Sequence, residues 1–262
     1  LSLSVAEIVV AKGADLVITV DNGISSFEGI EYLKSQGIQV LVTDHHLPAD
    51  SFPNADAMVN PNLPYCEFPS KSLAGVGVAF YVMLALRGKM REENLFTGTE
   101  PNLAELLDLV ALGTVADVVP LDHNNRILVH QGLSRIRSGA CRAGIKALAE
   151  VSKRDLSHLQ AADLGFAIAP RLNAAGRLEN MSLGVELLVA DNMDVARQLA
   201  FELDSLNQTR KEFEQEMKTE ALSICAKLPK LSQKGQAHGI TLYQPDWHQG
   251  VIGILASRIK DQ

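Results

Sequence analysis

The sequence predicts an α/β fold in which a parallel sheet is followed by a long helix and by the start of a second α/β domain. Residues 15–20 and 39–43 are short runs rich in β-branched residues, with a helix-like segment between them. Strand, helix and strand within about 30 residues form a βαβ unit, whose strands are parallel. A long amphipathic segment begins near residue 192, and another strand-like run begins at residue 239.

The elements around the second strand follow from local signals. A helix is expected to begin at Ser25 or Ser26, whose hydroxyls suit a helix N-terminus, and to end near residue 35. Residues 48–69, rich in Pro and Asn, are expected to form a long loop that contains a short strand at residues 57–59.

Four further helices are expected before residue 152, because apolar residues recur there at helical spacing. They are placed at residues 73–86, 103–111, 125–136 and 144–151. Gly113 is expected to end or bend the second of them just before Asp117.

The long amphipathic segment predicts one helix, capped by Asn192 or Asp194 and reaching about residue 228. Such a helix suits a bridge between two domains, and it equally suits the surface of a single domain. Residues 239–243 then predict the first strand of a new domain. The expected division is a catalytic domain, a connecting helix and the beginning of a second domain, at residues 1–191, 192–230 and 236–262.

Composition narrows the class of protein. No run of about 18 apolar residues is present, so no membrane span is expected. Three scattered cysteines, an odd number, indicate a reduced, cytoplasmic compartment. The net charge of −7 argues, taken alone, against a nucleic-acid binder. A site that holds divalent cations needs clustered carboxylates, however, and these contribute to that charge.

Polar residues with metal-binding chemistry follow both predicted strands. Asp21 follows the first strand, and Asp44, His45 and His46 follow the second. Parallel strands end at the same edge of a sheet, so these side chains converge. Carboxylates favour Mg²⁺ and Mn²⁺, and imidazole shifts the preference toward Mn²⁺ or Zn²⁺. The alternative is that the histidines are ordinary loop residues and that Asp21 only forms a turn.

Asp117 lies among apolar residues in the segment 113–120. Burying an unpaired carboxylate is costly, so Asp117 is expected to have a partner. A metal ion and a backbone N–H at a helix end are equally suitable partners.

Several of these segments, in this order, resemble motifs of the DHH phosphoesterase superfamily. The three superfamily motifs are Val20-Asp21-Asn22-Gly23, Thr43-Asp44-His45-His46 and Gly113-Thr114-Val115-Ala116-Asp117. Further stretches resemble the RecJ-type exonucleases within it, namely residues 72–80, 169–178 and 247–258. The resemblance spans essentially the whole chain. It implies a DHH domain, a connecting helix and the start of a DHHA1-type domain.

The resemblance implies a metal-dependent exonuclease that degrades single-stranded DNA from 5′ to 3′, with a role in recombination and repair. It implies Mn²⁺ or Mg²⁺ as the cofactor, in a two-metal site, and hydrolysis without a covalent intermediate. The implied partners are single-stranded DNA, a single-strand-binding protein and a helicase. No membrane partner is expected.

The resemblance also assigns roles to residues of the catalytic cluster. Asp21 would bridge two metal ions, and His45 and Asp117 would complete the ligands of one of them. His46 would lie beside the substrate phosphate. Asp44 would orient the turn and its imidazoles rather than bind metal, as carboxylates behind metal-ligating histidines commonly do.

DNA or phosphate contacts are expected from five residues further along the chain. They are Arg171, Asn173, Arg177, His248 and Gly250. An arginine fork suits phosphate, and backbone N–H groups at a helix N-terminus bind anions. The alternative for residues 169–178 is a helix-packing turn with its arginines on the surface. Trp247 suits either a core position or a base-stacking platform.

The chain departs from the superfamily pattern in one respect. The first motif, Asp-x-Asp, is absent, and it is expected on a strand preceding Leu1. The chain by itself is therefore expected to bind metal weakly and to be inactive or nearly so. Three other functions stay open: a DHH enzyme acting on short oligoribonucleotides or small phosphoesters, a non-catalytic scaffold of the same fold, and a generic α/β metal-dependent hydrolase.

Overall fold

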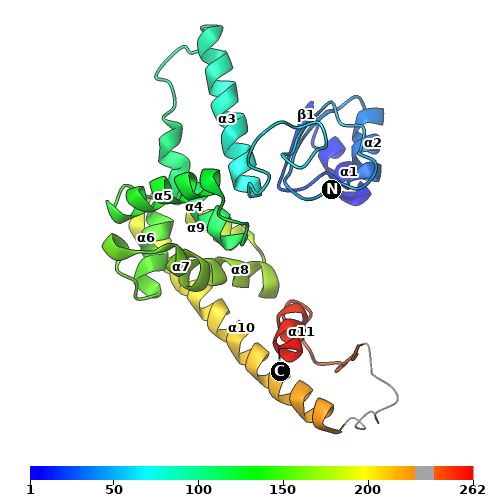
Figure 1. The fold of residues 1–262 in the computed structure, drawn as a ribbon, viewed down its shortest axis with the longest axis vertical. Helices are drawn as coiled ribbons and strands as arrows, with labels where there is room; N and C mark the ends of the chain where they lie inside the picture. Colours follow the sequence, from blue (N-terminus) through cyan, green and yellow to red (C-terminus); the bar gives the residue numbers. More distant parts are fainter. Residues whose placement is uncertain (228–238, 262) are drawn as a thin grey trace. The chain divides into compact units, whose positions relative to one another are not determined.

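The computed structural model describes residues 1–227 and 239–261 (Figure 1). The chain divides into two compact units. Unit 1 is Leu1–Cys141 with Leu156–Gly165, and unit 2 is Arg142–Asp155 with Phe166–Gln262. The expected domain boundaries, near residue 191 and over residues 230–236, stay predictions. Residues 228–238, on which part of that division falls, lie outside the described residues.

A three-stranded parallel sheet in unit 1 confirms the predicted βαβ unit. Its strands are β1 (Leu16–Val20), β2 (Gln39–Thr43) and β3 (Ala57–Val59), in the order β1-β2-β3. Leu16 lies opposite Gln39 in the register, and Val20 lies opposite Thr43. The three strands therefore end along one edge of the sheet.

Helices cover one face of this sheet. They are α1 (Leu3–Ala11), which was not predicted, and α2 (Phe27–Ser35), which was. Ile30 and Leu33 of α2 are buried together with Val40 and Val42 of β2. The opposite face is apolar as well, yet its side chains on β1 are largely exposed: Leu16, Ile18 and Val20.

The other regular elements of unit 1 are helical. Its elements are α3 (Gly75–Glu92), a 3₁₀ turn η1 (Leu103–Leu106), α4 (Leu107–Ala116), α5 (His123–Arg137), a 3₁₀ turn η2 (Leu156–His158) and α7 (Ala161–Asp163). These confirm the helices predicted near residues 73, 103 and 125. Their core contains Leu73, Val78, Phe80, Leu103, Val110 and Leu128.

The helix does not end at Gly113 as one alternative predicted, because α4 continues through it to Ala116, the residue before Asp117. The missing side chain of Gly113 serves packing instead. A Cβ at Gly113 would lie 2.7 Å from Cγ1 of Val76 on α3. Gly132 has a similar role on α5, where a Cβ would overlap the carbonyl oxygen of Leu107 and the Cβ of Ala111.

Unit 2 is helical throughout its regular structure. Its helices are α6 (Ala143–Val151), α8 (Ala169–Leu178), α9 (Ser182–Val189), α10 (Met193–Lys227) and α11 (Ile252–Lys260), and a π-helical turn, Leu164–Ile168, precedes α8. The predicted helix at residues 144–151 is confirmed as α6, whereas α9 was not predicted. The predicted long helix is confirmed as α10, and Asn192 caps it by accepting from the N–H of Asp194 at 2.7 Å.

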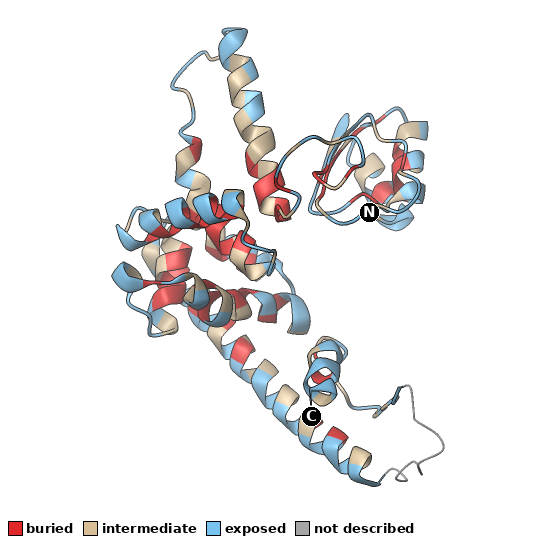
Figure 2. Ribbon diagram, in the orientation of Figure 1, coloured by how far each residue is buried: buried red, intermediate tan, exposed pale blue. Residues whose placement is uncertain are grey.

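Helix α10 packs on α6, α8, α9 and α11, all of which belong to the same unit. Figure 2 shows buried and exposed residues interleaved along α10, as expected for a helix that packs on one side. Its most buried residues are Ala196, Ala200, Leu203, Asn207, Met217 and Ala221. Small residues on this face allow neighbouring helices to approach closely.

The strand predicted at residues 239–243 is wrong, because these residues form neither helix nor strand. A strand requires a hydrogen-bonded neighbour, and the described part of the chain pairs none with this segment. Leu242 instead packs with Trp247 against an apolar cluster of Met217, Val251 and Leu255 between α10 and α11.

No helix within the described residues has the length and apolar character needed to cross a membrane. The three cysteines, Cys66, Cys141 and Cys225, are half-buried and form no disulfide.

Candidate metal centre

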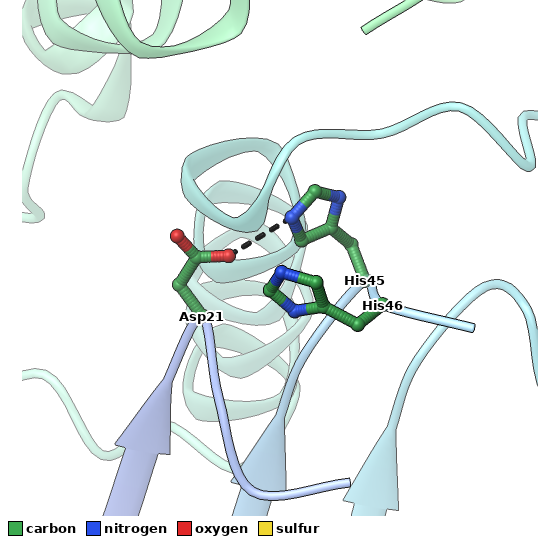
Figure 3. A group of neighbouring side chains, drawn as sticks. All are labelled: Asp21, His45 and His46. Carbon is green, nitrogen blue, oxygen red and sulfur yellow. Dashed lines mark ion pairs between the residues drawn. The ribbon is translucent and has the colours of Figure 1, made fainter. Parts of the chain in front are cut away.

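The carboxyl-terminal edge of the sheet brings together the residues predicted to bind metal. Asp21 follows β1 directly, and Asp44, His45 and His46 follow β2. Figure 3 shows Asp21 and His45 pointing toward each other above the strand ends, with His46 beside them. Ligand atoms of Asp21, His45 and His46 all lie within 4.8 Å of one another.

Asp21 occupies an unusual backbone position. Its φ of 61° is in the left-handed region, which residues other than glycine seldom adopt. Its N–H still donates to the carbonyl of Thr43 at 3.0 Å, which continues the β1–β2 ladder by one residue. Gly75, the first residue of α3, lies directly against the Asp21 side chain, where any Cβ would overlap the carboxylate. The carboxylate is thus placed by the ladder on one side and by α3 on the other.

Asp44 is buried and fully engaged in hydrogen bonds. Its Oδ2 accepts from the N–H of Ile24 at 2.9 Å, and its Oδ1 accepts from the N–H groups of His45 at 2.7 Å and of His46 at 3.1 Å. Burial alone would raise the pKa of Asp44, but these hydrogen bonds and one from the His46 ring lower it below its ordinary value. Asp44 is therefore an anion that holds the turn in place.

His45 directs its Nε2 between two carboxylates. Nε2 lies 3.0 Å from Oδ1 of Asp21 and 3.4 Å from Oδ2 of Asp117. The side chain is only 12% exposed, and Nε2 makes no hydrogen bond of good geometry with any described residue. A buried nitrogen facing two carboxylates across such distances suits a shared cation.

Asp117 reaches this cluster from the end of α4, where it is the C-cap residue. Burial raises the pKa of the Asp117 carboxyl, the neighbouring Asp21 carboxylate raises it further, and His45 opposes both effects. Val118, the next residue, has a φ of 60°, which is exceptional for a β-branched side chain. This local geometry turns the chain sharply at the point where Asp117 meets His45.

His46 is 60% exposed and is oriented by Asp44. Its Nδ1 lies 2.7 Å from Oδ1 of Asp44, and this contact raises the pKa of His46. In the neutral ring a proton on Nδ1 leaves a lone pair on Nε2. The geometry thus admits His46 either as a further metal ligand or as a neighbour of the substrate.

Two asparagines that the sequence analysis missed belong to the same edge. Asn60 follows β3 directly, and its Nδ2 donates to the carbonyl of His46 at 2.9 Å. Asn62 donates from its Nδ2 to the carbonyl of His45 at 2.6 Å. The signal that could have found them is their position after the third predicted strand, at the same edge as Asp21 and His45.

The residues predicted to bind DNA lie in unit 2. Arg177 donates from Nη1 to the carbonyl of Gly250 at 3.1 Å, and the Nδ1 of His248 accepts from the N–H of Gly250 at 3.1 Å. The His248 ring stacks on Phe213, with ring centroids 5.6 Å apart. Asn173 is exposed on α8. The structure therefore brings Arg177, His248 and Gly250 together.

Arg171 is directed elsewhere. Its side chain is 12% exposed, and its Nη2 lies 2.8 Å from Oδ1 of Asp204 on α10. Its Nη1 donates to the carbonyl of Ala167. Trp247, for which two roles were open, packs in the apolar cluster of unit 2 and donates from Nε1 to Glu220 at 2.8 Å.

The sequence of the chain is similar to that of known proteins of one family. Residues 3–114 match the model of the DHH family, N-terminal domain. The chain is 65% identical over 263 residues to the single-stranded-DNA-specific exonuclease RecJ of Haemophilus influenzae, an alignment that covers 100% of this chain and 46% of the relative. The chain thus spans about half the length of the curated relatives it matches.

Solved structures of RecJ are also similar to this chain. RecJ of Thermus thermophilus in complex with Mn²⁺ is 35% identical, with a TM-score of 0.82 and coverage of 99% of this chain and 36% of that chain. Its complex with Mg²⁺ is 33% identical, with a TM-score of 0.70 and the same coverage. The predicted α/β fold and the predicted resemblance are both confirmed.

Proposed function

We propose that this protein, which contains a DHH-family N-terminal domain and is similar to RecJ along its whole length, is a metal-dependent exonuclease. It would hydrolyse phosphodiester bonds of single-stranded DNA from 5′ to 3′, in recombination and repair. The observation on which the proposal rests is the position of His45 Nε2 between the carboxylates of Asp21 and Asp117.

The donor set fits a divalent cation such as Mn²⁺ or Mg²⁺. Asp21, His45 and Asp117 offer two carboxylates and one imidazole nitrogen, and Mn²⁺ accepts both kinds of donor. A divalent cation bound there would supply positive charge to the scissile phosphate and lower the pKa of an attacking water. Asp21, the most exposed of the three, is proposed to bridge two cations.

The residues behind these donors have roles that follow from their contacts. Asp44 accepts from both histidine N–H groups, so it fixes the turn on which His45 lies. His46 projects from the same turn and is exposed, so its ring would lie next to a phosphate bound at the site. Neither residue needs to act as a nucleophile.

Contacts with other phosphates of the single-stranded DNA are proposed for unit 2. Arg177 and His248 lie at Gly250, which precedes α11, and Asn173 is exposed on α8. An arginine and backbone N–H groups ahead of a helix suit phosphate. The guanidinium of Arg171 is already engaged by Asp204, so its predicted DNA contact has no structural support.

The cellular setting of the proposed enzyme is the cytoplasm, with single-stranded DNA as substrate. A single-strand-binding protein and a helicase are the proposed protein partners. The division into a DHH domain, a connecting helix and a DHHA1-type domain belongs to the same proposal.

The test uses the longest native polypeptide that contains this sequence. Mn²⁺ binding is measured by electron paramagnetic resonance, and hydrolysis is measured on end-labelled single-stranded DNA, duplex DNA and dinucleotides. We expect Asp21→Asn and His45→Ala to abolish hydrolysis while single-strand binding persists. Near-normal turnover in either variant would contradict the ligand assignment. Preference for dinucleotides would favour the other candidate, a DHH enzyme acting on short oligonucleotides.

A further inference from the structure

The end of β3 contributes two amide side chains to the turn that contains His45 and His46. Asn60 is the first residue after β3 and is buried, with 2% of its surface exposed. Its Nδ2 donates to the carbonyl of His46 at 2.9 Å, while its Oδ1 accepts from the N–H of Asn62 at 2.8 Å. One amide therefore binds the turn after β2 and shapes the loop after β3.

Asn62 completes the arrangement. Its Nδ2 donates to the carbonyl of His45 at 2.6 Å. The two carbonyls are thus held by two amides, and the two N–H groups of the same residues are held by the Asp44 carboxylate. Every backbone polar group of His45 and His46 has a side-chain partner, although neither residue belongs to a strand.

We propose that Asn60 and Asn62 are positioning residues, which aim the His45 imidazole at Asp21 and Asp117 by fixing the carbonyl side of its turn. This inference rests on the proposed metal site. A ligand histidine must meet its metal with both the right distance and the right ring plane, and the groups behind it set these. The His45 carbonyl and the His46 N–H share one peptide plane, which Asn62 and Asp44 hold from both ends. Asn60 holds the next peptide plane through the His46 carbonyl, which Asp44 does not reach.

The contacts require a side-chain N–H donor at both positions, and an acceptor as well at position 60. Asparagine presents a donor and an acceptor on one short side chain, and Asn60 uses both. Aspartate has the same shape but offers only acceptors when ionised. Asn→Asp would therefore set a carboxylate oxygen against a carbonyl oxygen and leave that carbonyl unsatisfied, at little change in volume.

The chain offers a matched control before β3. Asn54 is an exposed asparagine in the segment between β2 and β3, six residues before Asn60. Asn54→Asp makes the same change in charge at a solvated position. The control therefore shares the change in net charge, and it leaves the amide contacts to the His45 and His46 carbonyls intact.

The experiment compares Asn60→Asp, Asn62→Asp and Asn54→Asp in the full native chain with selective ¹⁵N labelling of histidine. In the metal-free protein we expect the His45 ring signals to shift and broaden in the first two variants and to match the parent in the control. For Mn²⁺ we expect affinity to fall by about 10- to 100-fold in the first two variants, with thermal unfolding still cooperative. Asn62→Ala, which removes the donor without adding charge, should have the same effect on the ring signals.

Unchanged His45 ring signals in Asn62→Asp and Asn62→Ala would overturn the inference, whatever the metal does. Asn62 is half-buried, so its variants keep the test valid if the buried Asn60→Asp variant does not fold. A parent that binds no Mn²⁺ would count against the proposed function. The ring signals of the metal-free protein would still decide the positioning role.

Discussion

Gly75→Ala separates the geometry of the metal centre from the stability of the fold. A Cβ at Gly75 would lie 2.7 Å from the Cβ of Asp21 and closer still to the carboxylate. Rotating the carboxylate relieves only the second contact, because the Asp21 Cβ is fixed by the backbone. That backbone is held in the ladder through Thr43. Asp21 and the first turn of α3 must therefore separate.

The magnitude follows from that displacement. Ordinary contact between the two Cβ atoms requires a shift of somewhat under ~1 Å, and misplacement of a reacting group by that amount can cost about 100-fold in rate. We expect Mn²⁺ affinity and hydrolysis to fall at least ~10-fold. Overpacking costs about 1–3 kcal/mol, and the better helix propensity of alanine returns part of that. Thermal unfolding should therefore change little compared with activity.

Gly88→Ala is the matched control, because Gly88 lies on the same helix and a Cβ there meets nothing within 4 Å. We expect it to stabilise the protein by about 0.5–1 kcal/mol and to leave Mn²⁺ binding unchanged. The assays are differential scanning calorimetry, Mn²⁺ titration and hydrolysis of labelled single-stranded DNA. Parental metal affinity and turnover in Gly75→Ala would refute the reasoning, and so would equal losses in both variants.

Asp122 caps α5 by accepting from the N–H of Asn125 at 2.9 Å, so Asp122→Ala should cost about 1 kcal/mol at neutral pH. Burial would raise the pKa of Asp122, but its hydrogen bonds lower it overall, so this contribution is present above the unfolded pKa near 4 and is lost as pH falls through the lower folded pKa. A stability gap that does not narrow as the pH falls below about 4 would contradict this. Arg177→Ala should weaken binding to single-stranded DNA and flatten its salt dependence by about one unit of slope, and an unchanged slope would make Arg177 structural. Arg171→Ala should destabilise the fold by about 2 kcal/mol because it leaves Asp204 uncompensated, while the salt slope stays unchanged.

Local sequence signals predicted the elements whose cause is local. The boundaries of β2 and β3 match the predicted runs, and Asn192 caps α10 through its own side chain. The strand expected at residues 239–243 depended instead on a neighbour that the segment itself could not specify. The packing role of Gly113 was likewise not predictable from neighbouring residues, because the side chain that it contacts, Val76, is 37 residues away in sequence.

The site was predictable to the extent that its residues end strands. Asp21, His45 and His46 were expected to converge because parallel strands end at one edge, and their ligand atoms do converge. Arg171 was expected on DNA because an arginine fork suits phosphate, and the motif gave no sign of its ion-pair partner. Its partner, Asp204, lies on α10, far along the chain. Asn60 was missed because asparagine after a strand is also an ordinary turn residue.

Exposure and hydrogen bonding distinguish two classes of polar residue at this edge. Asp44 is 1% exposed, and both of its oxygens accept from backbone N–H groups. Asp21 and Asp117 are far more exposed and lie at 3.0 and 3.4 Å from His45 Nε2. Asp21 and Asp117 could therefore bind a cation without losing backbone hydrogen bonds. Asp44 could bind it only if the hydrogen bonds that hold the turn of His45 were broken. We therefore expect Asp44 to position the turn rather than to bind metal, and Asn60 and Asn62 to hold the carbonyl side of the same turn.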